Sequence, residues 1–139
     1  EWFGFGPSEE MDGRTRVSVN GVGPGKSIDI LTSPDGVPAR NGVGTVHHVA
    51  LAIAESSEQA QLREALIKSG IKVTAIIDRS YFQSIYFREP GGVLFEVATV
   101  APGFDIDEPV EELGRGLKLP PWEQAKRAEI EAALPPIRY

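Results

Sequence analysis

Between residues 45 and 99 the sequence predicts one strand, one helix and then three more strands in unbroken order. Alternating apolar residues indicate the strands, which are expected over residues 45–53, 72–77, 81–88 and 93–99. Glu89-Pro90-Gly91-Gly92 predicts a hairpin turn between the last two. A β-α-β-β-β unit of this kind predicts an α+β fold in which the helix packs on a small sheet.

The predicted helix has a start signal, an apolar face and a stop signal. Ser56 and Gln59 have the spacing of a capping box, and Gly70 is a natural C-terminal stop. The apolar face between them consists of Ala60, Leu62, Leu66 and Ile67.

The regions on either side of this unit are less regular. Residues 14–20 and 26–31 alternate as two strands, which resemble the end of a similar unit, and residues 33–44 are rich in proline and glycine. We therefore expect residues 1–44 to form the end of an incomplete module plus a linker, and residues 45–100 to form a complete module. Residues 101–139 are expected to form an extended tail with a short helix over about 120–133.

Two histidines and one glutamate on predicted strands are candidate metal ligands. His47 and His48 lie on the first strand of the unit, and Glu96 lies in the apolar last strand. Successive strand residues point to opposite faces, so regular strand geometry prevents both histidines from binding one ion. Ala50 and Ala52 share a face with His48 and leave it open. A carboxylate on so apolar a strand is costly unless it is paired or bound to metal.

Tyr86 and Arg79 are candidates for the same site, since Tyr86 lies on the neighbouring hairpin strand and Arg79 in the turn before it. Taken singly, each candidate has an ordinary structural interpretation: a satisfied histidine, an edge-strand charge, a packed tyrosine or a solvated arginine. The combination favours a site. Two histidines and one carboxylate are the usual ligands of non-haem Fe(II), and this chain supplies one histidine and the carboxylate.

Four segments resemble the C-terminal half of hydroquinone-type ring-cleaving dioxygenases of the vicinal oxygen chelate superfamily: GTVHHVALAI, DRSYFQSIYFREPGGVLFEVAT, APGFDIDE and LGRGLKLPPWEQAKRAEIEAALPPI. The resemblance implies paired β-α-β-β-β modules that curl into a half-barrel around a metal. It also implies that His48 and Glu96 bind Fe(II), or alternatively Mn(II) or another divalent metal, and that His47, Arg79 and Tyr86 line the substrate pocket. The remaining histidine ligand of the family lies in its N-terminal half and has no counterpart here.

The function implied by this resemblance is cleavage of a hydroquinone-type aromatic ring with O2, with this chain as one half or subunit of the active enzyme. Arg79 would stabilise developing negative charge, and Tyr86 would donate a hydrogen bond to the substrate phenolate or exchange a proton with it. Three alternatives stay open: a metal-dependent glyoxalase-type isomerase or lyase, a metal-free resistance protein that binds an aromatic compound, and a subunit with a mainly structural role.

Composition narrows the range of partners. A net charge of −6 argues against nucleic acid or an anionic membrane surface. The sequence has no cysteine, which excludes disulfides and thiolate zinc sites. No apolar run approaches the roughly 20 residues that span a bilayer and no signal peptide is visible, so a cytoplasmic location is expected. Trp2, Phe3 and Phe5 form an aromatic cluster that predicts contact with a second chain, either an N-terminal half or another copy.

Overall fold

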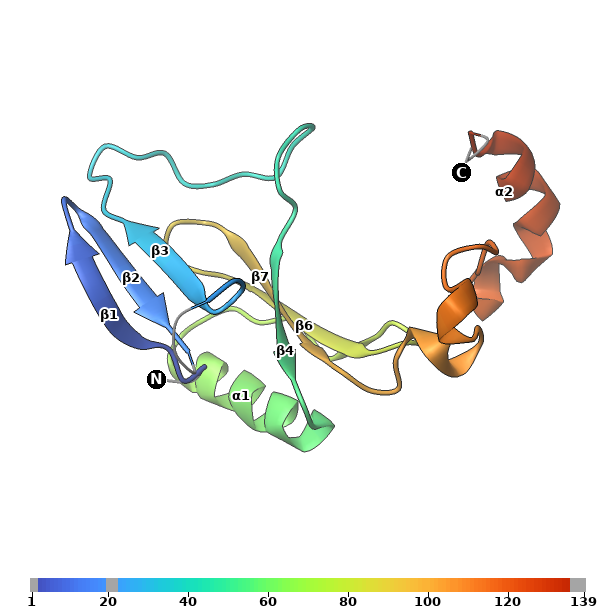
Figure 1. Cartoon of the computed structure of the whole chain (residues 1–139), viewed down its shortest axis with the longest axis horizontal. Coiled ribbons are helices and arrows are strands. Elements are labelled where there is room, and N and C mark those ends of the chain that lie inside the picture. Colours follow the sequence, from blue (N-terminus) through green and yellow to red (C-terminus); the bar gives the residue numbers. More distant parts are fainter. Residues whose placement is uncertain (1–2, 20–22, 136–139) are drawn as a thin grey trace.

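The computed structural model describes residues 3–19 and 23–135, which form two sheets, a helix and a C-terminal extension (Figure 1). The first sheet has three antiparallel strands, β1 (Gly6–Met11), β2 (Arg14–Ser18) and β3 (Ser27–Leu31), in that spatial order. The second sheet contains β4 (Val49–Ile53), β5 (Ile77–Asp78), β6 (Gln83–Arg88) and β7 (Leu94–Thr99). Helix α1 (Ser56–Lys68) contacts β4, β6 and β7.

The four-stranded sheet confirms the predicted β-α-β-β-β order and the α+β class. Its spatial order is β4-β7-β6-β5, and β4 runs parallel to β7 because α1 carries the chain back across the sheet. The cross-strand register places Ala50 on one side of Glu96 and Tyr86 on the other. The sheet stays open, so no closed barrel forms within the part of the chain that the structure describes.

Two predicted strands are shorter than expected, for local reasons. Residues 45–48 are not strand, because the Thr45 hydroxyl and N–H both bond to Gly42 and close a turn. The region 72–77 contributes only Ile77 to β5, plus a single bridge at Val73. There the Tyr86 N–H donates to the side chain of Thr74, so the regular backbone ladder is interrupted.

The end of α1 lies where the sequence predicts, whereas its N-cap differs from the predicted residue by one position. The N-cap is Glu55, which forms the capping box with Glu58, so the predicted box of Ser56 and Gln59 is wrong by one residue. The stop at Gly70 is confirmed. Its φ is +80°, its N–H bonds to the Ile67 carbonyl, and the next N–H bonds to the Leu66 carbonyl. This is the Schellman arrangement, which favours glycine.

Gln59 is unavailable for capping because it is buried against the sheet. Its side-chain amide donates to the carbonyls of Gln83 and Val97, each at 2.9 Å. The helix thereby holds both strands of the β6–β7 hairpin. Further along the same face of α1, Leu62 and Leu66 pack with the buried apolar residues of the hairpin: Ile85, Phe87 and Val97. Of the other residues predicted on this face, Ala60 is half-buried and Ile67 is exposed.

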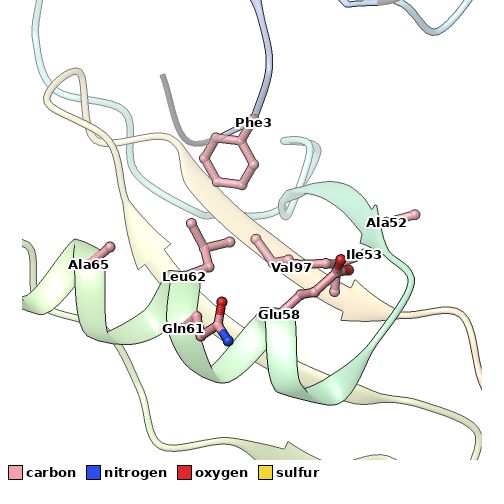
Figure 2. A pocket seen from close by; sticks show the side chains of 8 residues that line it. All are labelled: Phe3, Ala52, Ile53, Glu58, Gln61, Leu62, Ala65 and Val97. Atoms are coloured by element: carbon pink, nitrogen blue, oxygen red, sulfur yellow. The ribbon is translucent and has the colours of Figure 1, made fainter.

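Phe3 belongs to this core. Its ring stacks on Phe87 with the ring centroids 6.2 Å apart, so the expectation that Phe3 lacks a cover within the chain is wrong. Phe5 is half-buried, and Trp2 lies outside the described residues. A cavity of about 510 Å³ lies between α1, β4 and β7, and Phe3 is among the side chains that line it (Figure 2). Val97 lines this cavity, whereas the adjacent Glu96 points to the other face of β7.

The first sheet contains a strand that the sequence did not predict. β1 includes Gly6 and Pro7 and lacks apolar alternation, but an edge strand tolerates proline, and the ladder is irregular between Pro7 and Glu9. In β2 and β3 the central cross-strand pair is Arg16 and Asp29.

Asp29 is held by two arginines. Arg16 Nε lies 2.7 Å from Asp29 Oδ1, and Arg14 Nη1 lies 2.8 Å from Oδ2. The hydrogen bond from Arg16, and then the one from Arg14, hold the pKa of the Asp29 carboxyl well below its usual range. In β6 and β7 the corresponding central pair is Tyr86 and Glu96.

The C-terminal extension is mostly short 3-10 helices. These are η1 (Phe104–Ile106), η2 (Val110–Glu112) and η3 (Pro121–Lys126), and they are followed by α2 (Arg127–Ala133). The predicted helix over 120–133 therefore ends where expected but is α-helical only in its second half. The extension contacts the turn after β5 through Tyr81, which stacks on Phe104 with ring centroids 4.9 Å apart. The Tyr81 hydroxyl donates to Asp107 Oδ2 at 3.0 Å.

No helix within residues 3–19 and 23–135 combines the length and apolar character that a membrane crossing requires.

Candidate metal centre

Glu96 lies at the centre of the candidate site. It is the middle residue of β7, and only 4% of its surface is exposed. Its Oε1 accepts hydrogen bonds from the hydroxyl of Tyr86, at 2.7 Å, and from the hydroxyl of Ser84. Its Oε2 lies 2.7 Å from Nε2 of His48. A buried carboxylate needs such donors, because an unpaired charge in this position would be strongly destabilising.

His48 approaches Glu96 from just before β4. Its Nε2 faces the carboxylate, and its Nδ1 lies 2.7 Å from Nδ1 of His47. The two histidines precede the strand, so the strand-geometry expectation that they point to opposite faces is wrong. Each His48 nitrogen nevertheless has a different neighbour, so His47 and Glu96 lie on opposite edges of the same ring. This geometry suits His47 as a support for His48.

Tyr86 and Arg79 extend the site on its other side. The Tyr86 hydroxyl donates to Glu96, and Arg79 Nη2 in turn lies 3.3 Å from the Tyr86 oxygen. The guanidinium carbon also lies 5.6 Å from the centre of the Tyr86 ring. The structure thus joins all five residues singled out from the sequence in one chain of contacts: Arg79, Tyr86, Glu96, His48 and His47.

Three further residues, which bond to members of this series of contacts, were not assigned to the site from sequence. Ser84 is fully buried and bonds to Glu96; its place on the Tyr86 face of β6 was the available signal. Arg88 Nη2 donates to Asn41 Oδ1 at 2.7 Å, and Asn41 Nδ2 donates to the His47 carbonyl. Asn41 lies in a loop forty-seven residues from Arg88 in sequence, and no local pattern relates them.

The loop that precedes His47 is held against the β6–β7 turn. The Ala39 N–H donates to the Gly91 carbonyl at 2.7 Å. Gly92 has a φ of +90°, and a Cβ built there would lie 2.8 Å from the Ala39 carbonyl oxygen. The close approach therefore requires glycine at position 92. The same loop carries Asn41, which bonds to Arg88 at the end of β6.

The donors of this site suit a divalent metal. An imidazole nitrogen and a carboxylate are ligands that such metals accept, and His48 Nε2 lies 2.7 Å from Glu96 Oε2. In the described residues the ion-pair partner of Glu96 is His48, with no lysine or arginine in contact. Residues 3–19 and 23–135 contain no group of three or more potential ligands, so within them His48 and Glu96 form a partial ligand set.

The chain belongs to the glyoxalase/bleomycin resistance protein/dioxygenase superfamily, whose family model matches residues 1–97. Within this class the ring-cleaving dioxygenases are close relatives. MhqE of Bacillus subtilis, assigned by name to that group, is 41% identical over 139 residues, which are 99% of this chain and 44% of MhqE. The chlorohydroquinone/hydroquinone 1,2-dioxygenase of Sphingobium indicum is 38% identical over 83% of this chain and 36% of that protein.

Solved structures agree with the fold. A crystal structure named as a dioxygenase from Bacillus subtilis superposes with a TM-score of 0.87 at 36% identity, covering 97% of this chain and 43% of that one. The fosfomycin resistance protein FosX of Listeria monocytogenes matches with a TM-score of 0.53 at 20% identity, over 70% of this chain and 74% of that one. The predicted vicinal oxygen chelate fold is thereby confirmed. The chain spans about two fifths of the length of the dioxygenase relatives.

Proposed function

We propose that this chain forms part of a non-haem Fe(II)-dependent dioxygenase that cleaves the ring of a hydroquinone-type substrate with O2. One observation carries the proposal. Glu96 is buried, yet it is surrounded by a histidine and two hydroxyl donors rather than by a lysine or arginine. A carboxylate in that setting suits a metal ion that provides the missing positive charge. Similarity to a chlorohydroquinone/hydroquinone dioxygenase supports the substrate class.

In this proposal His48, through Nε2, and Glu96 hold the metal, and a histidine from another segment or chain completes the set. Fe(II) is favoured by the ring-cleaving relatives, and Mn(II) or another divalent ion is the alternative. Bound Fe(II) would supply the open coordination positions and electron transfer that O2 chemistry requires. His47 Nδ1 lies 2.7 Å from Nδ1 of His48, so a hydrogen bond between them would orient the His48 ring with Nε2 toward the metal.

Tyr86 and Arg79 act on the substrate side of the site. The Tyr86 hydroxyl donates a hydrogen bond to Glu96 in this structure. With that carboxylate bound to a metal, the same hydroxyl could instead donate a hydrogen bond to a phenolate oxygen of the substrate. Arg79 provides a fixed positive charge next to Tyr86 that would stabilise negative charge developing on the substrate.

The test measures metal content and O2 consumption in the active assembly that contains this chain. We expect His48→Ala and Glu96→Ala to lose bound iron and hydroquinone cleavage together. Glu64→Gln, on the exposed face of α1, is the matched control and should retain both. Unchanged metal content in both site variants would contradict the ligand assignment. Metal binding with isomerase activity and no O2 consumption would favour the glyoxalase-type alternative.

A further inference from the structure

We propose that a second cavity, beside the candidate metal centre, binds an apolar substituent on the substrate ring. This inference rests on the proposed function. The cavity has a volume of about 430 Å³ and lies between the turn after β5 and the C-terminal extension. Arg79 and Tyr81 line it from the turn, and Ile106, Leu119 and Trp122 line it from the extension.

Arg79 connects this cavity to the candidate metal centre. The same side chain lines the cavity and places its Nη2 3.3 Å from the Tyr86 hydroxyl, which bonds to Glu96. Two hydrogen bonds therefore separate the edge of the cavity from the proposed metal carboxylate. In this proposal, a substituent on a ring held at Tyr86 and Glu96 would enter the cavity by extending past Arg79.

Three of the charged residues that line the cavity make hydrogen bonds to uncharged groups. Asp78 Oδ1 accepts the Ser80 N–H at 2.8 Å, and Asp107 Oδ2 accepts the Tyr81 hydroxyl at 3.0 Å. Lys118 Nζ donates to the Asp107 carbonyl at 3.1 Å. With two cations and two anions on the lining, the cavity has no excess charge to select an ionic group.

The apolar part of the lining, in contrast, is accessible. Trp122 is 68% exposed and Ile106 is 54% exposed. Burying such surface against an apolar group is favourable, and the volume leaves room for a branched alkyl group. The chemistry of the lining therefore favours hydroquinones that carry an uncharged apolar substituent over unsubstituted hydroquinone.

Two substitutions on the extension form a matched pair for the test. Ile106→Ala removes apolar surface from the cavity, whereas Val110→Ala removes a similar, 64% exposed side chain of the same extension outside the lining. The measurement is kcat/KM of the active assembly for tert-butylhydroquinone and for hydroquinone. We expect Ile106→Ala to lower the ratio of the two values about tenfold, with hydroquinone itself changed less than twofold. Val110→Ala should keep the wild-type ratio.

The outcomes separate this inference from the proposed function. Cleavage of both compounds with the same ratio in wild type and Ile106→Ala would overturn the cavity assignment alone. Cleavage of neither compound by the wild-type assembly would overturn the proposed function. In that case, equilibrium binding of tert-butylhydroquinone without O2 tests the cavity directly. Weaker binding in Ile106→Ala than in Val110→Ala would support the cavity, and equal binding would overturn it.

Discussion

Tyr86 lies between Glu96, the candidate metal ligand, and the positively charged Arg79. Its hydroxyl donates to Glu96 and lies 3.3 Å from Arg79 Nη2. Neither Tyr86 nor Arg79 is a proposed ligand, so their removal should affect turnover rather than metal binding.

We therefore predict that Tyr86→Phe and Arg79→Ala reduce kcat by about 10²–10³ while the iron content stays at the wild-type value. Steady-state kinetics on hydroquinone, combined with metal analysis of the same samples, checks this. A Tyr86→Phe assembly that turns over at the normal rate would show that the tyrosine only packs.

Single residues show how far the sequence could predict the site. The predicted hairpin placed Tyr86 on the strand next to that of Glu96, because strand and turn signals are local. The register adds that the two residues pair directly. The relation between His47 and His48 was predicted wrongly, since a turn closed by Thr45 precedes them and β4 begins only at Val49. Asn41 could not be found, because its role depends on a contact across forty-seven residues.

Among the elements, the loop before β4 and the β6–β7 turn fit together at Gly92. Replacing it with alanine imposes both a positive-φ penalty and a clash with the Ala39 backbone. Gly114→Ala is a matched control, because Gly114 has a φ of +80° with no atom within 4 Å of an added Cβ.

We predict that Gly92→Ala lowers the free energy of unfolding by more than the roughly 1–2 kcal/mol expected for Gly114→Ala. It should also weaken metal binding, since the displaced loop carries Asn41 and the histidines. Denaturant unfolding and metal titration measure the two effects. Equal losses of stability in both variants would argue against a tight contact at Ala39.

In the first sheet, the Asp29 ion pairs predict a pH dependence of stability. The pKa of Asp29 is lowered on folding, chiefly by the hydrogen bond from Arg16, so its contribution is complete above the pKa of an unfolded aspartate, about 4. The contribution is lost as the pH falls below that value. We predict that wild type exceeds Asp29→Asn in unfolding free energy by a constant amount above about pH 5, and that the difference shrinks in stronger acid. A difference that does not change with pH would contradict this.

At the level of elements, the sequence predicted the order of the second sheet because each turn there has a local signal, such as Gly70 or Glu89-Pro90-Gly91-Gly92. It missed β1, whose residues pair with β2 without an apolar pattern of their own. It also overextended the strand at 72–77, because the bond between Tyr86 and the Thr74 side chain depends on the tertiary fold.

For the whole molecule, the partial ligand set and the open edge of β3 lead to one expectation. In the second sheet β4 pairs alongside β7, whereas in the described residues no strand pairs with the outer side of β3. Exposed sheet edges are usually covered in natural proteins. We propose that a segment or chain that supplies the third ligand also covers this edge.

We predict that iron and activity are found only in an assembly larger than this chain. Native mass measurement with metal analysis distinguishes its forms, since a homodimer would give a symmetric site with two histidines and two glutamates. A stable monomer of this chain that binds iron and has full dioxygenase activity would contradict the proposal.

The two central carboxylates, Asp29 on β3 and Glu96 on β7, occupy matching positions in their hairpins and differ in the kind of neighbour they have. Asp29 is neutralised by arginines, whose charge is permanent at physiological pH. Glu96 is surrounded by hydroxyls and an imidazole, which can share or release protons. An incoming cation would have to compete with arginine at Asp29 but only with protons at Glu96. The positions of the arginines therefore determine which of the two matching carboxylates is available to bind a cation.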